Sequence, residues 1–543
     1  MNEAAKRISA EALQQRLGGK GEIALLDVRE QGVHYKGHPF FASSAPLSRL
    51  ELMIGDLVPR KSAPIVVFDD GDGLAETAAA RLAGFGYSDI ALLEGGLTAW
   101  RAAGFEVFSG INVPSKAFGE FVEHHYGTPR IPAAELKALK DKGTDLVILD
   151  SRPFEEYRRM NIPGGVDTPG AELAFRVHDQ APDPNTLVVV NCAGRTRSII
   201  GAQSLINAGI RNKVVALKDG TMGWELAGFE CEHGAGRRAP IPSRDGAAKA
   251  KEAAERVGKR FGVKTTSRSQ VWTWLRDPSR TTYLLDVRSP EEYAAGHIAG
   301  ARHAPGGQLV QGTDEYCAVR NARIVLADPE RVRAVMTASW LIQLGWKDVF
   351  VLAPEGHDGF SGWPVARGSR RGAAAQGAVA GGLKPWPAIA PAAWYQRMRG
   401  QADCAAIDLG SSLRHRDRHV PYAWWAARSR LTEAKKFVFN PRVLLLTSDD
   451  GFAARLAAPE AASLWPNAEV LVLAGGNAAW FAAGLPIEKG LDRATSATDD
   501  VWYKPYDHPG DVLKQHMQDY LDWEVALVEQ IKRDPTIKFK AFD

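Results

Sequence analysis

The strongest constraint on the fold of this chain is a pattern that occurs four times along it. A short apolar run ends in an aspartate in each copy, as IALLD, LVILD, YLLD and AAID, at Asp27, Asp150, Asp286 and Asp408. Successive aspartates are 123, 136 and 122 residues apart. Because the chain has 543 residues, a repeat of this length indicates four similar domains rather than one large domain.

Two further apolar runs follow each aspartate, with an alanine-rich helical stretch between them. The second runs read PIVVFD, TLVVVNC, ARIVLAD and RVLLLTS, and the third runs read IALLEGG, VVALKDG, VFVLAPEG and VLVLAGG. Continuous Val, Ile and Leu runs that alternate with helices are typical of parallel strands covered on both faces. The sequence therefore predicts an α/β protein of four tandem domains, each a parallel sheet with helices on both faces.

The compositional breaks between the copies set the expected domain limits. We expect four domains, called units 1 to 4 below, at 1–110, 120–235, 266–366 and 386–490, with a C-terminal helical extension at 491–543. The segment 367–387 has the Gly, Ala and Pro composition of a flexible spacer. Residues 509–533 carry apolar side chains at helical spacing, so we expect one amphipathic helix that docks on a neighbouring domain or subunit.

Charge and cysteine usage argue against several classes of function. The 67 Lys and Arg residues nearly balance the 64 Asp and Glu residues, which gives no support to a nucleic-acid or membrane-surface partner. No apolar run approaches the roughly 18 residues of a membrane span, and residues 1–17 read as an amphipathic helix rather than a signal peptide. The four cysteines form no C-x-x-C pair, so no disulfide scaffold, metal site or cofactor is expected. We therefore expect a cytoplasmic protein with reduced thiols.

The loop after the second apolar run distinguishes one unit from the others. In α/β proteins, function lies where the carboxyl end of a strand meets the next helix. At 42 residues after the landmark aspartate, units 1 to 3 carry Asp69, Cys192 and Asp328, and Ser448 is nearest to this position in the shorter unit 4. Since only unit 2 has a thiol there, we expect one active site per chain.

The residues that follow Cys192 are those that a sulfur nucleophile needs. An unperturbed thiol, with a pKa near 8.5, is only about 3 per cent ionised at neutral pH, although the thiolate is the reactive form. Backbone N–H groups at a helix N-terminus, helped by two arginines, would stabilise a thiolate, a persulfide or an oxyanion. We predict that Cys192 is the catalytic nucleophile and that substrate is bound by Ala193, Gly194, Arg195, Thr196, Arg197 and Ser198.

Asp150 is predicted to brace this loop. We expect its carboxylate to pair with Arg197, and Asp286 to pair with Arg333 in the same way in unit 3. For Arg197, bracing and substrate contact are compatible roles, and both stay open. Arg195 is interpreted as an anion-binding residue because of its place in the loop.

Several other polar residues receive a structural interpretation. Eleven residues after each landmark aspartate stand His38, Asn161, His297 and His419. Because the unit with the thiol has asparagine there, a turn or capping hydrogen bond explains this set better than acid–base chemistry. Cys231 could resolve a persulfide as a disulfide, but a passive thiol is favoured, and Cys317 and Cys404 are interpreted as structural.

Several of these motifs together resemble rhodanese domains. They are the LDxR strand ends, the string GHIAGA, the loop led by Cys192 and the closing run KDGTMGW that begins at Lys218. The resemblance spans nearly the whole chain as four tandem units and is best in unit 2. It implies transfer of a sulfane sulfur through a Cys192 persulfide, from a donor such as thiosulfate to cyanide or another thiophile. Units 1, 3 and 4 resemble inactive rhodanese modules, because a carboxylate or hydroxyl cannot carry a persulfide.

Two other functions stay open at this stage. A Cys-based phosphatase or arsenate reductase would use a Cys-x5-Arg cradle, whereas Cys192 and Arg197 form a tighter Cys-x4-Arg with Ser198 at the longer spacing. The chain could instead be a persulfide carrier or scaffold that receives sulfur from a protein partner, and it could form a homo-oligomer. The charges of Arg195 and Arg197 favour thiosulfate over 3-mercaptopyruvate as donor, while the physiological donor and acceptor stay open.

Overall fold

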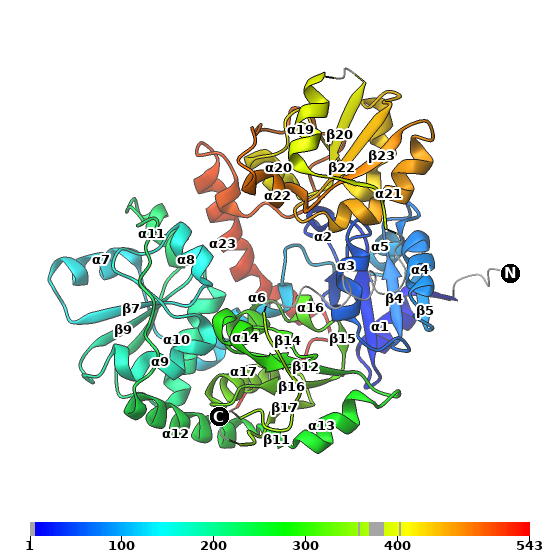
Figure 1. Cartoon of the computed structure of the whole chain (residues 1–543). Coiled ribbons are helices and arrows are strands. Elements are labelled where there is room, and N and C mark those ends of the chain that lie inside the picture. Colours follow the sequence, from blue (N-terminus) through cyan, green and yellow to red (C-terminus); the bar gives the residue numbers. More distant parts are fainter. Residues whose placement is uncertain (1–5, 357–358, 369–384, 401–402, 543) are drawn as a thin grey trace.

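The computed structural model describes residues 6–356, 359–368, 385–400 and 403–542 (Figure 1). Within these residues, four sheets with the same strand order follow one another along the chain, one for each copy of the repeat. This arrangement confirms the prediction of an α/β protein made of four tandem parallel-sheet domains. Most of the predicted spacer 367–387 lies outside the described residues.

The sheet of unit 2 shows the common topology. Its order is β6-β10-β9-β7-β8, and every neighbouring pair is parallel. The strands are β6 (Arg130–Ile131), β7 (Leu146–Asp150), β8 (Val166–Asp167), β9 (Leu187–Asn191) and β10 (Val214–Leu217). Since the chain enters each strand from the same end, all carboxyl ends, and the loops that follow them, lie at one edge of the sheet.

The other three sheets repeat this order. Unit 1 contains β1 (Lys6–Ile8), β2 (Ile23–Asp27), β3 (Ala42–Ser44), β4 (Ile65–Phe68) and β5 (Ile90–Leu93). Unit 3 contains β11 (Lys264–Thr266), β12 (Thr282–Asp286), β14 (Arg302–His303), β16 (Arg323–Ala327) and β17 (Val349–Leu352). Unit 4 contains β19 (Ala388–Ile389), β20 (Cys404–Asp408), β21 (Trp424–Trp425), β22 (Val443–Thr447) and β23 (Glu469–Leu473).

Short strands outside this pattern join parts of the molecule. In unit 3, β15 (Val319–Arg320) pairs antiparallel with β2 of unit 1, so a strand of unit 3 extends the sheet of unit 1. The strands β13 (His297–Ile298) and β18 (Val365–Ala366) form a separate antiparallel pair within unit 3.

Helices cover both faces of each sheet. In unit 2, Val189 of β9 packs in a core with Leu136 and Trp224, which lie on α7 (Ala133–Asp141) and α11 (Gly220–Leu226). Its neighbours Val188 and Val190 face the opposite core, with α9 (Leu173–Gln180) and α10 (Thr196–Ala208). This alternation follows from the two-residue side-chain period of a strand, and burial on both faces explains the continuous apolar runs.

The remaining helices follow the same plan in each unit. Units 1 and 2 contain α1 (Ala10–Leu17), α2 (Gln31–His34), α3 (Leu50–Leu57), α4 (Leu74–Gly84), α5 (Gly96–Ala102) and α8 (Phe154–Arg159). Units 3 and 4 contain α13 (Arg268–Leu275), α14 (Pro290–Ala295), α15 (Gly306–Gln311), α16 (Thr313–Tyr316), α17 (Val332–Gln343), α19 (Pro391–Gly400), α20 (Ser412–Asp417), α21 (Phe452–Leu464) and α22 (Gly476–Ala482). None of the helices within the described ranges is long and apolar enough to cross a membrane.

The prediction of one amphipathic helix over residues 1–17 is wrong where the structure describes this segment. Lys6–Ile8 instead form β1, the edge strand of unit 1, which pairs in parallel with β5. The helix α1 begins only at Ala10, because the Ser9 side chain accepts a hydrogen bond from the Ala12 N–H and caps it. Strand pairing therefore overrides the helical periodicity before Ser9.

Three long helices lie between the units. The helix α6 (Val113–Tyr126) joins unit 1 to unit 2, and α12 (Arg244–Phe261) joins unit 2 to unit 3. The helix predicted over 509–533 is α23 (Leu513–Gln530), followed by a 3-10 turn at Ile531–Arg533. It packs on α6 and, in red in Figure 1, runs between unit 2 and units 1 and 4. The expected docking of this helix on neighbouring domains is confirmed.

Candidate active site

Cys192 lies in the short loop that joins β9 to α10 at the carboxyl edge of the sheet. Its side chain is only 2% exposed, and the thiol donates a hydrogen bond to the Ser198 hydroxyl, with 3.5 Å between sulfur and oxygen. The Ser198 hydroxyl in turn donates to the carbonyl of Arg195 at 2.8 Å. The thiol is thus held against the first turn of α10, where backbone N–H groups have no partner within the helix.

The start of α11 fixes the other side of this loop. The Thr221 N–H donates to the carbonyl of Cys192 at 2.8 Å, and the Met222 N–H donates to that of Ala193 at 3.0 Å. Gly220 has a φ of +58°, and a Cβ there would lie 2.3 Å from the Cys192 carbonyl oxygen. Only glycine allows the backbone to come this close to the Cys192 carbonyl, so the run KDGTMGW holds the loop through Gly220.

Arg195 is held by three carboxylates. Its guanidinium donates to Glu120 at 2.7 Å through two nitrogens, to Glu123 at 2.6 Å and to Asp219 at 3.0 Å. Burial opposes its positive charge, but these carboxylates more than compensate and raise the pKa of Arg195 above its ordinary value. The protein therefore already balances the charge of Arg195, and direct contact with substrate stays a prediction.

Arg197 pairs with Glu156, and the predicted pair with Asp150 is wrong. The two Arg197–Glu156 hydrogen bonds measure 2.8 and 3.2 Å. Although burial favours the neutral acid, Arg197 holds the pKa of Glu156 at about 2. The Asp150 carboxylate is instead occupied by Arg152, at 2.7 and 2.9 Å, and by the Asn191 amide at 3.1 Å. Arg152 forms this pair in place of Arg197 because it stands only two residues after Asp150, so its side chain reaches the carboxylate at the end of the strand.

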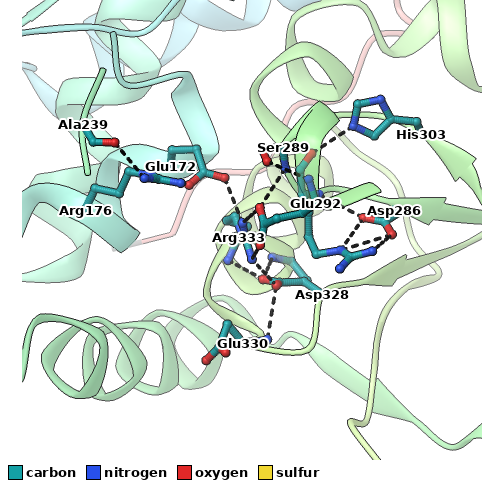
Figure 2. Close-up of polar contacts among 12 residues, drawn as sticks. Glu172, Arg176, Ala239, Asp286, Ser289, Glu292, His303, Asp328, Glu330 and Arg333 are labelled. Carbon is teal, nitrogen blue, oxygen red and sulfur yellow. Dashed lines mark hydrogen bonds and ion pairs between the residues drawn. The ribbon is translucent and has the colours of Figure 1, made fainter. Parts of the chain in front are cut away.

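The expected pair of Arg333 with Asp286 in unit 3 is wrong for the same reason. Asp286 is occupied by Arg288, at 2.6 and 2.9 Å. Figure 2 shows that Arg333 lies among Asp328, Glu292 and Glu172, with hydrogen bonds of 2.9, 2.5 and 3.0 Å. Glu172 belongs to unit 2, so this arginine also ties two units together.

In units 1, 3 and 4, the side chain at the position equivalent to Cys192 accepts hydrogen bonds from backbone N–H groups of the next helix. The Asp69 carboxylate accepts from the Ala75 N–H at 3.0 Å, and that of Asp328 accepts from Arg333 N–H at 2.9 Å and Ala334 N–H at 3.2 Å. The Ser448 hydroxyl accepts from the Ala454 N–H at 3.3 Å. The donors at the same offsets in unit 2 belong to Arg197 and Ser198.

The residues eleven positions after each landmark aspartate make hydrogen bonds of the predicted kind. His38, Asn161, His297 and His419 each hydrogen-bond a backbone carbonyl, at 2.9, 3.3, 2.8 and 2.7 Å. All four cysteines are free thiols, and burial raises the pKa of both Cys231 and Cys317 to about 12. Among the residues that the structure describes, no cluster of three or more His, Cys, Asp or Glu could hold a metal ion.

Sequence reasoning missed the residues that reach this loop from distant segments. Glu120, which binds Arg195, lies on α6. Glu524 lies on α23 and accepts from the Thr196 hydroxyl at 3.1 Å and from Lys116 at 2.9 Å. Because Glu524 stands 328 residues from Thr196, no local spacing in the sequence could indicate the contact.

Known proteins resemble this chain at two levels. A family model described as Rhodanese-like domain matches residues 9–103, 132–227 and 267–363. The crystal structure of a thiosulfate sulfurtransferase from Pseudomonas aeruginosa has 45% sequence identity and a TM-score of 0.92, and the match covers 99% of this chain and 100% of that one.

Two curated proteins match over single stretches. An HTH-type transcriptional regulator of Mycobacterium tuberculosis is 33% identical over 111 residues, which are 20% of this chain and 48% of that protein. The Bacillus subtilis protein YrkF, named for a proposed role as a sulfur carrier, is 32% identical over 97 residues, 17% of this chain and 51% of that protein. This chain therefore spans about half the length of these two relatives.

Proposed function

This chain belongs to the rhodanese family, and from that premise we propose that it is a sulfurtransferase whose single active site is the Cys192 loop. One observation carries the proposal. At the equivalent position, units 1, 3 and 4 place an oxygen of their own side chain on the N–H groups of the next helix. Unit 2 alone places a thiol there, so its helix start is available to a sulfur anion and its substrate.

The proposed reaction has two displacement steps. The Cys192 thiolate attacks the outer sulfur of thiosulfate, a sulfur–sulfur bond forms, and sulfite leaves with the electron pair of the bond that breaks. Cyanide then attacks the outer sulfur of the resulting persulfide, thiocyanate leaves, and the Cys192 thiolate is restored. The N–H groups of Arg197 and Ser198 would stabilise the anionic sulfur in both steps.

Thiosulfate is the donor that the relatives support best. The Pseudomonas aeruginosa protein that matches the whole chain is a thiosulfate sulfurtransferase by name. The charges of Arg195 and Arg197 favour thiosulfate less than the sequence suggests, because carboxylates already pair with both arginines. Backbone N–H groups, rather than free cations, would therefore hold a dianionic donor.

Turnover with two small molecules tests this proposal. Release of thiocyanate from thiosulfate and cyanide is measured for the wild type, for Cys192→Ala, and for Cys404→Ala as a matched control in unit 4. We expect activity in the wild type and the control, and only the background rate in Cys192→Ala. Equal activity in all three proteins, or none in any of them, would contradict the proposal.

A persulfide carrier is the second candidate, favoured by the match to YrkF. In that case a protein donor loads Cys192 and the persulfide persists without turnover. Stable labelling by a protein persulfide, together with poor thiocyanate release, would favour this function over the first. We further propose a cytoplasmic location, where the thiol stays reduced.

A further inference from the structure

The loop that follows Cys192 is covered, whereas its counterpart in unit 1 is open. Gly194, Arg195 and Thr196 are buried, although they lie in a surface loop at the edge of a sheet. In unit 1 the equivalent residues 70–73 are all exposed. Since the four units share one fold, a segment from outside unit 2 must cover the loop that carries the thiol.

That segment is α23. A Cβ added at Gly194 would lie 3.0 Å from a Glu524 carboxylate oxygen, 3.3 Å from the Tyr520 ring and 3.6 Å from Leu521. Met517 and Leu521 of this helix form an apolar cluster with Met222 of α11, and Ala193 packs against it. The helix therefore lies directly on the loop that follows Cys192, with no room for a side chain at position 194.

Tyr520 is the aromatic residue of α23 that lies against the loop, 3.3 Å from the Cβ position of Gly194. Its ring stacks on Trp502 and lies tilted against Trp523, with centroids 5.9 and 5.4 Å away. Its hydroxyl donates to Glu524 at 3.2 Å, and burial keeps the pKa of Tyr520 well above its ordinary value, with charges at Glu524, Arg197 and Cys192 also acting on it. Two aromatic neighbours thus hold the ring beside Gly194.

Units 1 and 4 hold this helix in place. The Trp523 indole donates to the carbonyl of Ser109 at 3.0 Å, next to unit 1. Before the helix, Asp500 accepts from Arg49 of unit 1 at 3.3 Å and from the Ser412 N–H of unit 4 at 3.1 Å. Two units that lack a cysteine at the position of Cys192 therefore anchor the segment that covers the loop of unit 2.

We propose that α23 is the selecting wall of the Cys192 site, and that the Tyr520 ring admits donors of the size of thiosulfate but excludes persulfides of peptide size. This inference rests on the proposed sulfur transfer for its substrate class. It gives units 1 and 4 a role, because they fix the position of the wall.

Alkylation of the full chain tests the wall without any sulfur transfer. Iodoacetamide and a maleimide coupled to a peptide serve as small and large probes, and peptide mass spectrometry follows Cys192, with Cys404 as the internal reference. The variants are Tyr520→Ala, Tyr520→Leu in case the first does not fold, Tyr520→Phe, which keeps the ring, and Val525→Ala. Val525 lies on the same helix but is exposed, so its variant is the matched control.

We expect Tyr520→Ala and Tyr520→Leu to raise the ratio of large-probe to small-probe labelling at Cys192 by roughly ten-fold or more, as expected when one side chain sets the size of a pocket. Tyr520→Phe and Val525→Ala should match the wild type. An unchanged ratio in the Ala and Leu variants, or a rise in the Phe variant equal to theirs, would overturn the inference.

Kinetics separate this inference from the proposed function. In the same variants, kcat/KM for glutathione persulfide relative to thiosulfate should rise by a similar factor. If no variant and no wild-type protein transfers sulfur, the proposed function fails while the labelling ratio still decides whether Tyr520 forms the wall. If transfer occurs but neither ratio changes, the wall is wrong and the function stands.

Discussion

Units 2 and 3 share one fold, yet the loop of unit 3 carries an aspartate that binds the next helix, and the loop of unit 2 carries a thiol at the same position. In unit 3, Asp328 satisfies the N–H groups of Arg333 and Ala334 and pairs with the Arg333 guanidinium (Figure 2). In unit 2 a thiol takes this place, and a thiol is a weak acceptor for the same donors. We therefore expect the N–H groups of Arg197 and Ser198 to be less well satisfied than those of Arg333 and Ala334, at a cost in stability that a binding site can require.

The arginine at the end of the loop, in contrast, forms the same kind of ion pair in both units. Arg197 pairs with Glu156, and Arg333 pairs with Glu292 at the corresponding place in unit 3. Because the pair is present in a unit without a nucleophile, it does not by itself mark the chemistry. It braces the loop in both units, and only in unit 2 does the braced loop carry a reactive group.

The largest expected effect contrasts Asp328→Ala with Cys192→Ala. Asp328→Ala leaves Arg333 without one of its buried partners, so we expect unit 3 to lose about 3–5 kcal/mol of local stability. Cys192→Ala should cost on the order of 1 kcal/mol in unit 2, while it abolishes sulfur transfer. Hydrogen exchange of the β16 and β9 amides measures the two local stabilities. Equal losses of local stability in the two units would contradict the proposed difference between Asp328 and Cys192.

A smaller effect is expected for the glutamates that hold the two arginines. Glu156→Gln should lower kcat/KM for thiosulfate by roughly 10- to 100-fold, because a charge-assisted hydrogen bond contributes about 1.5–3 kcal/mol. Glu292→Gln, the matched change in unit 3, should leave kcat/KM unchanged. The pKa of Glu156 is about 2, below its ordinary value, so its contribution to stability is present above about pH 4.5 and is lost as the pH falls through about 2. Loss of activity in both variants would contradict a site confined to unit 2.

The smallest effect concerns the residue beside each landmark aspartate. Asp167 pairs in register with Asp150, whereas His303 takes this place beside Asp286 in unit 3. Burial, with repulsion from Asp150, raises the pKa of Asp167 to about 7. The folded state therefore holds a proton that the unfolded chain releases near pH 4, and stability falls as the pH rises from about 4 to 7.

Asp167→Asn removes this titration. At pH 8 we expect the variant to exceed the wild type by on the order of 2 kcal/mol in stability, while at pH 4 the two proteins should be alike. Thermal unfolding at both pH values measures the difference, with His303→Asn as the control in unit 3. A gain of the same size at pH 4 and pH 8 would rule out the titration of Asp167 as its cause.

The parts of this molecule that are local in sequence could be predicted, and those that depend on distant segments could not. The strand runs, the four-fold repeat and the position of Cys192 follow from spacings within one unit. The partners of Arg195 and Thr196 do not, because Glu120 and Glu524 come from helices outside the repeat. The sequence predicts a pair of Asp150 with Arg197, but Arg152 stands only two residues from Asp150 along the chain and forms the ion pair instead.

The central claim is that one thiol of four carries the sulfur. Peptide mass spectrometry of the full chain after treatment with thiosulfate, and again after cyanide, tests it most directly. We expect the peptide with Cys192 to gain the mass of one sulfur atom and to lose it with cyanide, while the peptides with Cys231, Cys317 and Cys404 stay unchanged. Sulfur on another cysteine, or a gain at Cys192 that cyanide cannot remove, would contradict it.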